Sequence, residues 1–162
     1  MTTDDSTADL REGRSETPFE RADRNWNEIL QEARVIQTST QIIGGFLLAV
    51  AFQQRFDELE QHQLVLYLVL VALAGLATAL GLALVVMHRG HFGKRKKIRI
   101  VRIGNRLLIC NLVVVSVLAA LVTGFIFDFT VNATAGIIAF AAGLVVTFSL
   151  WTVLLSDGRR NR

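Results

Sequence analysis

Four long uncharged segments, mainly apolar, alternate with short charged segments between residues 36 and 155. The clearest runs from Gln63 to Met87 and holds twenty-five residues without a charge. At a rise of ~1.5 Å per residue it would form a helix of about 37 Å, long enough to cross a hydrocarbon core of ~30 Å. The pattern predicts four transmembrane helices, at about residues 36–54, 63–87, 107–127 and 133–155.

The polar region before these segments is predicted in two parts. Residues 1–17 carry charges of both signs and little apolar surface, which is typical of a disordered tail. Pro18 can open a helix, because the N–H that it lacks is one that a first turn leaves unpaired. Within 18–35 apolar residues recur at helical spacing, so we expect an amphipathic helix in the membrane interface, with Trp26 at headgroup depth. The alternative is a helix that packs on the central basic loop.

The predicted fold is therefore all-α: a polytopic membrane protein with a four-helix transmembrane bundle, an N-terminal amphipathic interfacial helix and a short basic tail at 157–162. Small residues recur at every fourth position in the last three spans, and such stripes let helices approach closely. The stripes are Gly75, Ala79 and Ala83; Ser116, Ala120 and Gly124; and Ala135, Ala139 and Gly143.

The charges predict the orientation of the chain. The formal net charge is +3, but the segment from His88 to Arg106 holds eight Lys or Arg residues and no acid. Basic loops stay on the cytoplasmic side, and placing both termini there leaves Arg55 as the one base of seventeen on the far side. We expect a multi-pass protein with both termini in the cytoplasm.

The same loop predicts contact with anionic lipid, because each Lys or Arg near an anionic leaflet contributes ~1 kcal/mol. A docking or nucleic-acid patch is the other interpretation, but Phe92 is the loop's one aromatic residue, so we expect no nucleic-acid partner. The expected lipid contacts are Lys94, Arg95, Lys96, Lys97, Arg99, Arg102 and Arg106.

The first span is the most polar of the four. On a helix Arg34, Gln37 or Thr38, Gln41 and Gly45 share one face. Polar groups are costly against lipid, so this face is expected to turn toward other helices. It could act as hydrogen-bonding glue between helices or line a polar vestibule that opens to the cytoplasm.

Catalytic and metal chemistry finds little support. All fourteen acids lie outside the four uncharged segments, whereas proton relays usually need a carboxylate within a span. The histidines lack the depth that a haem needs and the further ligands that zinc needs. The single cysteine, Cys110, rules out an intrachain disulfide. We expect no enzyme activity, no catalytic residue, no metal site and no cofactor.

Two stretches, 24–56 and 66–92, resemble an uncharacterised bacterial family of small four-span membrane proteins. The similar motifs are Asn25-Trp26, the run from Leu30 to Thr38, Gln54-Arg55-Phe56 and His88-Arg89. The resemblance implies the fold and a location in the bacterial inner membrane, and some members of that family are labelled sodium/proton antiporters. It also implies a cluster of polar residues near the cytoplasmic surface. These are Glu32, Arg34, Gln37, Thr38, Gln41, His88 and Arg89.

The leading functional hypothesis is a non-enzymatic membrane protein that packs, assists or regulates. Its expected partners are membrane lipids and either further copies of the chain or another membrane protein. One alternative is a small cation or proton transporter whose pathway is lined by the polar face of the first span. A second is a sensor that responds to lipid charge through the basic loop.

Overall fold

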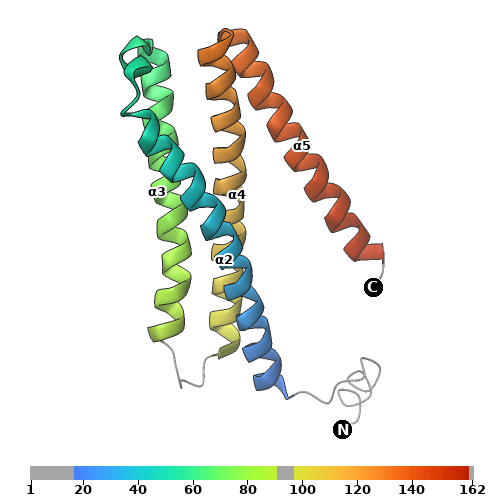
Figure 1. The fold of residues 1–162 in the computed structure, drawn as a ribbon. Helices are drawn as coiled ribbons and strands as arrows, with labels where there is room; N and C mark the ends of the chain where they lie inside the picture. The colour runs from blue at the N-terminus through green and yellow to red at the C-terminus, as the bar shows by residue number, and fades with distance from the viewer. Residues whose placement is uncertain (1–16, 91–96, 161–162) are drawn as a thin grey trace.

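The computed structural model describes residues 17–90 and 97–160, and these form long helices. In chain order they are α2 (Pro18–Val50), the short 3₁₀ helix η1 (Gln54–Glu58), α3 (Gln61–Gly90), α4 (Lys97–Thr130) and α5 (Ala133–Arg160) (Figure 1). We call the end where α2 turns into α3 and α4 into α5 the turn end, and the opposite end the loop end. The predicted N-terminal disordered segment up to residue 16 and the loop residues Lys94–Lys96 lie outside the described residues.

A capping box starts α2. Thr17 accepts a hydrogen bond from the backbone N–H of Glu20 at 3.3 Å, and its own N–H donates to the Glu20 carboxylate at 2.8 Å. Pro18 occupies the first turn, as predicted, where its missing N–H costs nothing. The two backbone hydrogen bonds satisfy donors that a helix start leaves unpaired.

The predicted amphipathic helix and the predicted first span are parts of one helix, because α2 continues without a break from Pro18 to Val50. It also ends before residue 54, the expected end of the span. Carbonyls near this end are satisfied locally: the Tyr67 hydroxyl donates to Leu47 O at 2.9 Å, and Gln53 N donates to Val50 O at 3.1 Å. Because of these bonds, α2 can end at Val50 without leaving the carbonyl groups of its last turn unpaired.

Three helices are long and apolar enough to cross a membrane: α3 within Gln61–Met87, α4 within Ile100–Thr130 and α5 within Ala133–Val153. α2 is not among them, which differs from the prediction of four spans. The physical reason is its early end, because the uncharged part of α2 runs only from Val35 to Val50, about 24 Å of helix. The structure therefore has the character of a membrane protein, with α2 as its most polar long helix.

α2, α3 and α4 pack together as a three-helix unit, with α2 crossing obliquely over the other two (Figure 1). Two apolar clusters fill its interior. The cluster nearer the turn end holds Leu47, Tyr67, Leu70, Ala74, Leu118 and Phe125. The cluster nearer the loop end holds Trp26, Ile29, Ala33, Leu84 and Leu108. Each cluster takes residues from all three helices, so burial holds the unit together along its whole length.

Trp26 lies inside this unit and not at the surface. Its side chain is 7% exposed and packs on Gly104 of α4, where a Cβ atom would collide with the indole ring. The indole therefore contacts protein inside the unit and is not exposed as it would be on a helix lying in the membrane interface. The structure shows the alternative, in which the start of α2 packs against the helix that follows the basic loop.

α5 packs mainly against α4 and diverges from it toward the loop end (Figure 1). Near the turn end the two helices are close, because a Cβ on Gly124 would lie 2.9 Å from Phe140 Cβ and one on Gly143 would lie 3.2 Å from Ala120 Cβ. Two of the three predicted small-residue stripes thus meet each other. The third, on α3, turns outward, since a Cβ on Gly75 would have no atom within 4 Å.

Candidate functional site

A layer of polar side chains separates the two apolar clusters of the three-helix unit, and we call it the amide layer. It comprises Gln37 and Thr40 of α2, Gly81 of α3 and Asn111 of α4. Asn111 is fully buried and Thr40 is 1% exposed. Buried amides are uncommon in the middle of an apolar helix bundle, so this layer is the leading candidate for a functional site.

Gly81 makes room for both amides. A Cβ at this position would collide with Gln37 Oε1 and lie 3.7 Å from Asn111 Nδ2. The two side chains therefore converge from α2 and α4 on the same point beside α3. Any larger residue at position 81 would displace the Gln37 side chain.

The amides are short of hydrogen-bond partners within the described part of the chain. Thr40 Oγ1 donates to Ile36 O at 2.9 Å, so its donor is satisfied in its own helix. Gln37 Oε1 and both polar atoms of Asn111 are buried without a partner. Each such atom costs about 1–3 kcal/mol unless water or another polar group reaches it. The layer can therefore bind water or another small polar species through amide N–H and C=O groups, but it holds no group that titrates near neutral pH.

The structure brings only part of the predicted polar face into this layer. Gln37 points inward, whereas Arg34, Thr38, Gln41 and Gly45 are exposed on the side of α2 that faces away from α3 and α4. α2 is rotated this way because its apolar residues at helical spacing fill the two clusters. We call the four outward residues the α2 outer stripe.

The remaining predicted residues are dispersed. Glu32 and Arg89 are exposed, and the His88 side chain lies outside the described residues. Lys97 and Arg99 begin α4, while Arg102 and Arg106 are exposed on it one and two turns later.

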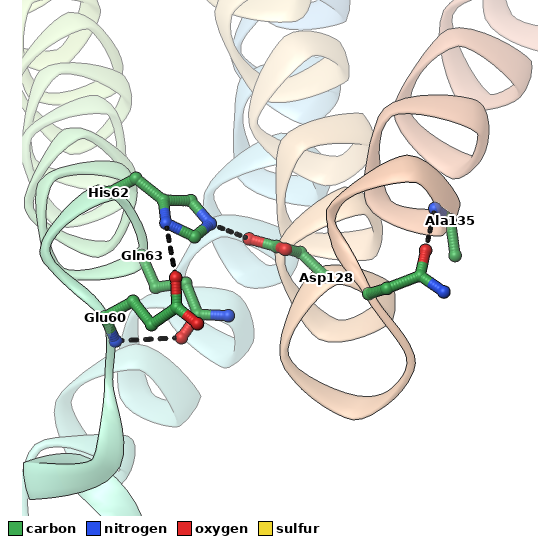
Figure 2. Close-up of polar contacts among 6 residues, drawn as sticks. Glu60, His62, Gln63, Asp128 and Ala135 are labelled. Atoms are coloured by element: carbon green, nitrogen blue, oxygen red, sulfur yellow. Dashed lines mark hydrogen bonds and ion pairs between the residues drawn. The ribbon is translucent and has the colours of Figure 1, made fainter.

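A second polar cluster lies at the turn end and joins α3 to α4 (Figure 2). His62 Nε2 lies 3.1 Å from Asp128 Oδ2, and His62 Nδ1 lies 3.3 Å from Glu60 Oε2. The Asp128 side chain is 9% exposed, whereas Glu60 is largely exposed. With a carboxylate beside each ring nitrogen, the imidazole can act as a clasp between the two helices.

Two further hydrogen bonds order the helix starts near this clasp. The backbone N–H of Glu60 donates to Gln63 Oε1 at 3.1 Å, which orders the start of α3. Asn132 Oδ1 accepts a hydrogen bond from Ala135 N at 2.9 Å and caps α5 (Figure 2). Among the described residues no group of three or more His, Cys, Asp or Glu side chains could hold a metal ion.

Sequence reasoning missed Asn111, Thr40 and the His62–Asp128 pair. Asn111 carried a usable signal, since it is an amide within an otherwise apolar span and such residues tend to face other helices. The His62–Asp128 pair carried none, because the two residues are sixty-six positions apart.

Comparison with known proteins gives one match. No curated protein and no solved structure matches the chain. A family described as being of unknown function, DUF6328, matches residues 15–155, which covers the helices α2 to α4 in full and α5 to its last turns. With three helices able to cross a membrane, the chain has the character of a membrane protein. The chain belongs to the DUF6328 family.

Proposed function

We propose that this chain is a non-enzymatic protein of the bacterial inner membrane that acts as an accessory or regulatory subunit, by pairing with a second copy of itself. In this proposal all four long helices lie in the membrane, with the loop end and both termini on the cytoplasmic side. The basic segment around Arg102 and Arg106 supports this orientation, because positive loops remain in the cytoplasm.

The α2 outer stripe is the observation that carries the proposal. Gln41 lies in the middle of the uncharged part of α2, and its side chain is exposed on the chain's own surface. The neighbouring hydroxyls are already satisfied, since Thr38 donates to Arg34 O at 3.0 Å and Ser39 donates to Val35 O at 3.2 Å. An amide exposed to hydrocarbon at this depth is costly, so protein contact over the stripe would stabilise it.

A second copy suits this stripe better than an apolar helix does. An amide is both donor and acceptor, so two Gln41 side chains across a two-fold axis satisfy each other reciprocally. Gly45, one turn further along, leaves space for close approach, because a Cβ there would have no atom within 4 Å. The stripe therefore combines a self-complementary polar pair with a small residue, as membrane helix interfaces do.

The test is the oligomeric state of the full chain in lipid bilayers, measured by energy transfer between labelled copies over a range of dilution in lipid. We expect wild type to dimerise, Gln41→Leu to weaken the dimer about fivefold and Gly45→Leu to weaken it by more than that. Gly75→Leu is the matched control, because it places the same side chain at another outward glycine, on α3.

Two results would contradict the proposal. Wild type that stays monomeric at every dilution would exclude self-association as its mode of action. Loss of the dimer in Gly75→Leu, with Gly45→Leu unchanged, would move the interface from α2 to the small-residue stripe of α3.

Cation or proton transport is a second candidate, favoured by the unpaired atoms of the amide layer. Gln37 Oε1 and the Asn111 amide could line a hydrated step halfway through the bundle. An apolar cluster that includes Leu47, Leu70 and Leu118 closes the way from this layer to the turn end, so transport would require that cluster to open. This barrier is why pairing, and not transport, is our leading proposal.

Ion flux into sealed proteoliposomes separates the two functions. A pH-sensitive dye would be followed under Na⁺ or K⁺ gradients for wild type, Asn111→Leu and Gln37→Leu, with Gln41→Leu as an outward-facing comparison. Pairing without transport predicts tight liposomes for every chain. Flux in wild type that the two inward substitutions abolish, with folded protein retained, would establish transport instead.

A further inference from the structure

The face that α4 turns toward α5 changes character along its length. Residues spaced three or four apart form one continuous stripe on this face. From the turn end the stripe runs Gly124, Ala120, Val117, Val113, Cys110, Arg106 and Arg102. It begins with the close contacts made by Gly124 and Ala120, and it ends with two exposed arginines beyond the point where α5 has moved away.

An apolar groove of about 450 Å³ opens between these two ends, where α4 and α5 diverge. Its walls are formed by Val113, Ser116 and Val117 of α4 and by Leu144, Val145, Thr147, Phe148, Ser149 and Trp151 of α5. The Ser116 hydroxyl donates to Leu112 O at 2.8 Å, and the Thr147 hydroxyl donates to Gly143 O at 2.9 Å. Because those donors are satisfied within their own helices, the groove offers mainly apolar surface to an occupant.

We propose that this groove binds one anionic phospholipid, with an acyl chain between α4 and α5 and the phosphate on Arg102 and Arg106. The apolar walls fit hydrocarbon, and the arginines on the same stripe supply the charge that complements a phosphate. Arg106 lies seven residues from Val113, about 10 Å along the helix, which places the charge just beyond the mouth of the groove. Guanidinium groups bind phosphate oxygens in pairs, so arginine suits this position.

The size of the groove favours a lipid chain over a protein helix. A volume of about 450 Å³ lies within the range of small-ligand sites, whereas a helix with its side chains is about 10–12 Å across. This site differs from general attraction of a basic loop to an anionic leaflet, because it requires the groove as well as the charge. It is also separate from the α2 outer stripe, so it does not depend on pairing of two copies.

Lipid retention by the full chain, measured by native mass spectrometry after release from nanodiscs, tests the site. The nanodiscs would contain a phosphatidylglycerol and a phosphatidylcholine with the same acyl chains. We expect wild type to retain the anionic lipid about tenfold more than the zwitterionic one, and the double variant Arg102→Gln/Arg106→Gln to lose this preference. Val113→Trp, which fills the groove, should lower retention of both lipids several-fold.

Each variant has a control with the same substitution at an exposed position of α3, away from the groove. Arg89→Gln removes an exposed basic charge from α3, and Val86→Trp adds an indole at an exposed position of α3, so both should retain lipid as wild type does. Quenching of Trp151 by phosphatidylglycerol with brominated chains, compared with brominated phosphatidylcholine at the same low mole fraction, gives a second readout within the groove.

The outcomes are distinct. An unchanged preference for anionic lipid in Val113→Trp would show that surface charge alone is responsible and would overturn the groove site. Equal losses in Arg89→Gln and in the double arginine variant would overturn the assignment of the headgroup. Release of retained lipid by added inorganic phosphate would show binding through the phosphate without the acyl chain, which also contradicts the proposal.

Discussion

α4 packs against its neighbours in two different ways. Toward α2 and α3 it turns large side chains such as Leu108, Leu118 and Phe125, which interlock with apolar residues of both helices. Toward α5 it turns small residues at one end, Ala120 and Gly124, and valines that border a groove further along. One face is a filled core with an amide layer across it, and the other is a close contact near the turn end from which the two helices diverge.

The difference shows how packing in a membrane protein can be uneven. About 28% of the membrane-length windows of α3 and α4 is buried, against 6% of that of α5. Lipid tails are as apolar as leucine, so α5 gains little by closing onto α4 over its whole length. The contact forms where small residues allow the backbones to approach, and elsewhere lipid can take the place of protein.

Truncation of one tryptophan in each region should give the largest contrast. Trp26→Ala empties the space beside Gly104 in the three-helix unit and should cost about 3–5 kcal/mol in the free energy of unfolding. Trp151→Ala removes a partly exposed side chain at the groove and should cost about 0.5 kcal/mol or less. Chemical unfolding in mixed micelles, followed by circular dichroism, measures both. Equal losses would mean that α5 is as firmly packed as the rest.

Adding one methyl group to the close contact between α4 and α5 should have a smaller effect. In Gly124→Ala the new Cβ would lie 2.9 Å from Phe140 Cβ and 3.0 Å from Gly136 O, so the helices must separate, at a cost of about 1–3 kcal/mol. Gly75→Ala meets no atom within 4 Å and serves as the control, with stability unchanged or slightly raised. Thermal unfolding of both variants would decide, and an unaffected Gly124→Ala would contradict the close contact.

Replacing the amide of Asn111 distinguishes a dry layer from a hydrated one. If Nδ2 and Oδ1 are unpaired, Asn111→Leu removes that cost and should stabilise the protein by about 1 kcal/mol, whereas Asn111→Ala leaves a cavity and destabilises it. Unfolding measurements on the two variants provide the comparison. A clear loss of stability in Asn111→Leu would indicate that ordered water satisfies the amide.

The smallest effect concerns the capping box at the start of α2. Hydrogen bonds from the Thr17 backbone N–H and hydroxyl lower the pKa of Glu20 below its usual value of 4.5. The cap should therefore contribute fully above pH 4.5 and lose its contribution as the pH falls through the lowered pKa. Amide hydrogen exchange at Arg21, whose N–H bonds to Thr17 O, reports this fraying. Glu20→Gln should remove this pH dependence. If exchange at Arg21 still depended on pH in that variant, a group other than Glu20 would be responsible.

Much of the helical architecture could be predicted from the sequence, because length and absence of charge are local properties. The segments 63–87 and 133–155 lie within α3 and α5, and the segment 107–127 lies within α4. The capping box was also readable, as Thr17 followed three residues later by Glu20 is a common helix start. The continuity of α2 was missed, because a change from polar to apolar composition does not require a change of direction.

The rotation of α2 could not be derived in the same way. Hydropathy distinguishes inside from outside in water, but in a membrane both the lipid and the neighbouring helices are apolar. The face with Gln37 and Gln41 was therefore expected to turn toward the other helices. The structure turns Gln37 inward together with Thr40, but leaves Gln41 exposed. The helix is held in this orientation by Trp26 and Leu47, one in each apolar cluster.

By itself the sequence determined that this is an all-helical chain with long uncharged segments and a basic junction, because those features depend on neighbouring residues and on the thickness of a membrane. Only the tertiary structure decided which residues meet. Asn111 reaches Gly81 and Gln37, and His62 reaches Asp128, because three helices cross at particular depths and rotations. The groove beside α5 also belongs to the tertiary structure, since it exists only where two helices that begin in contact separate.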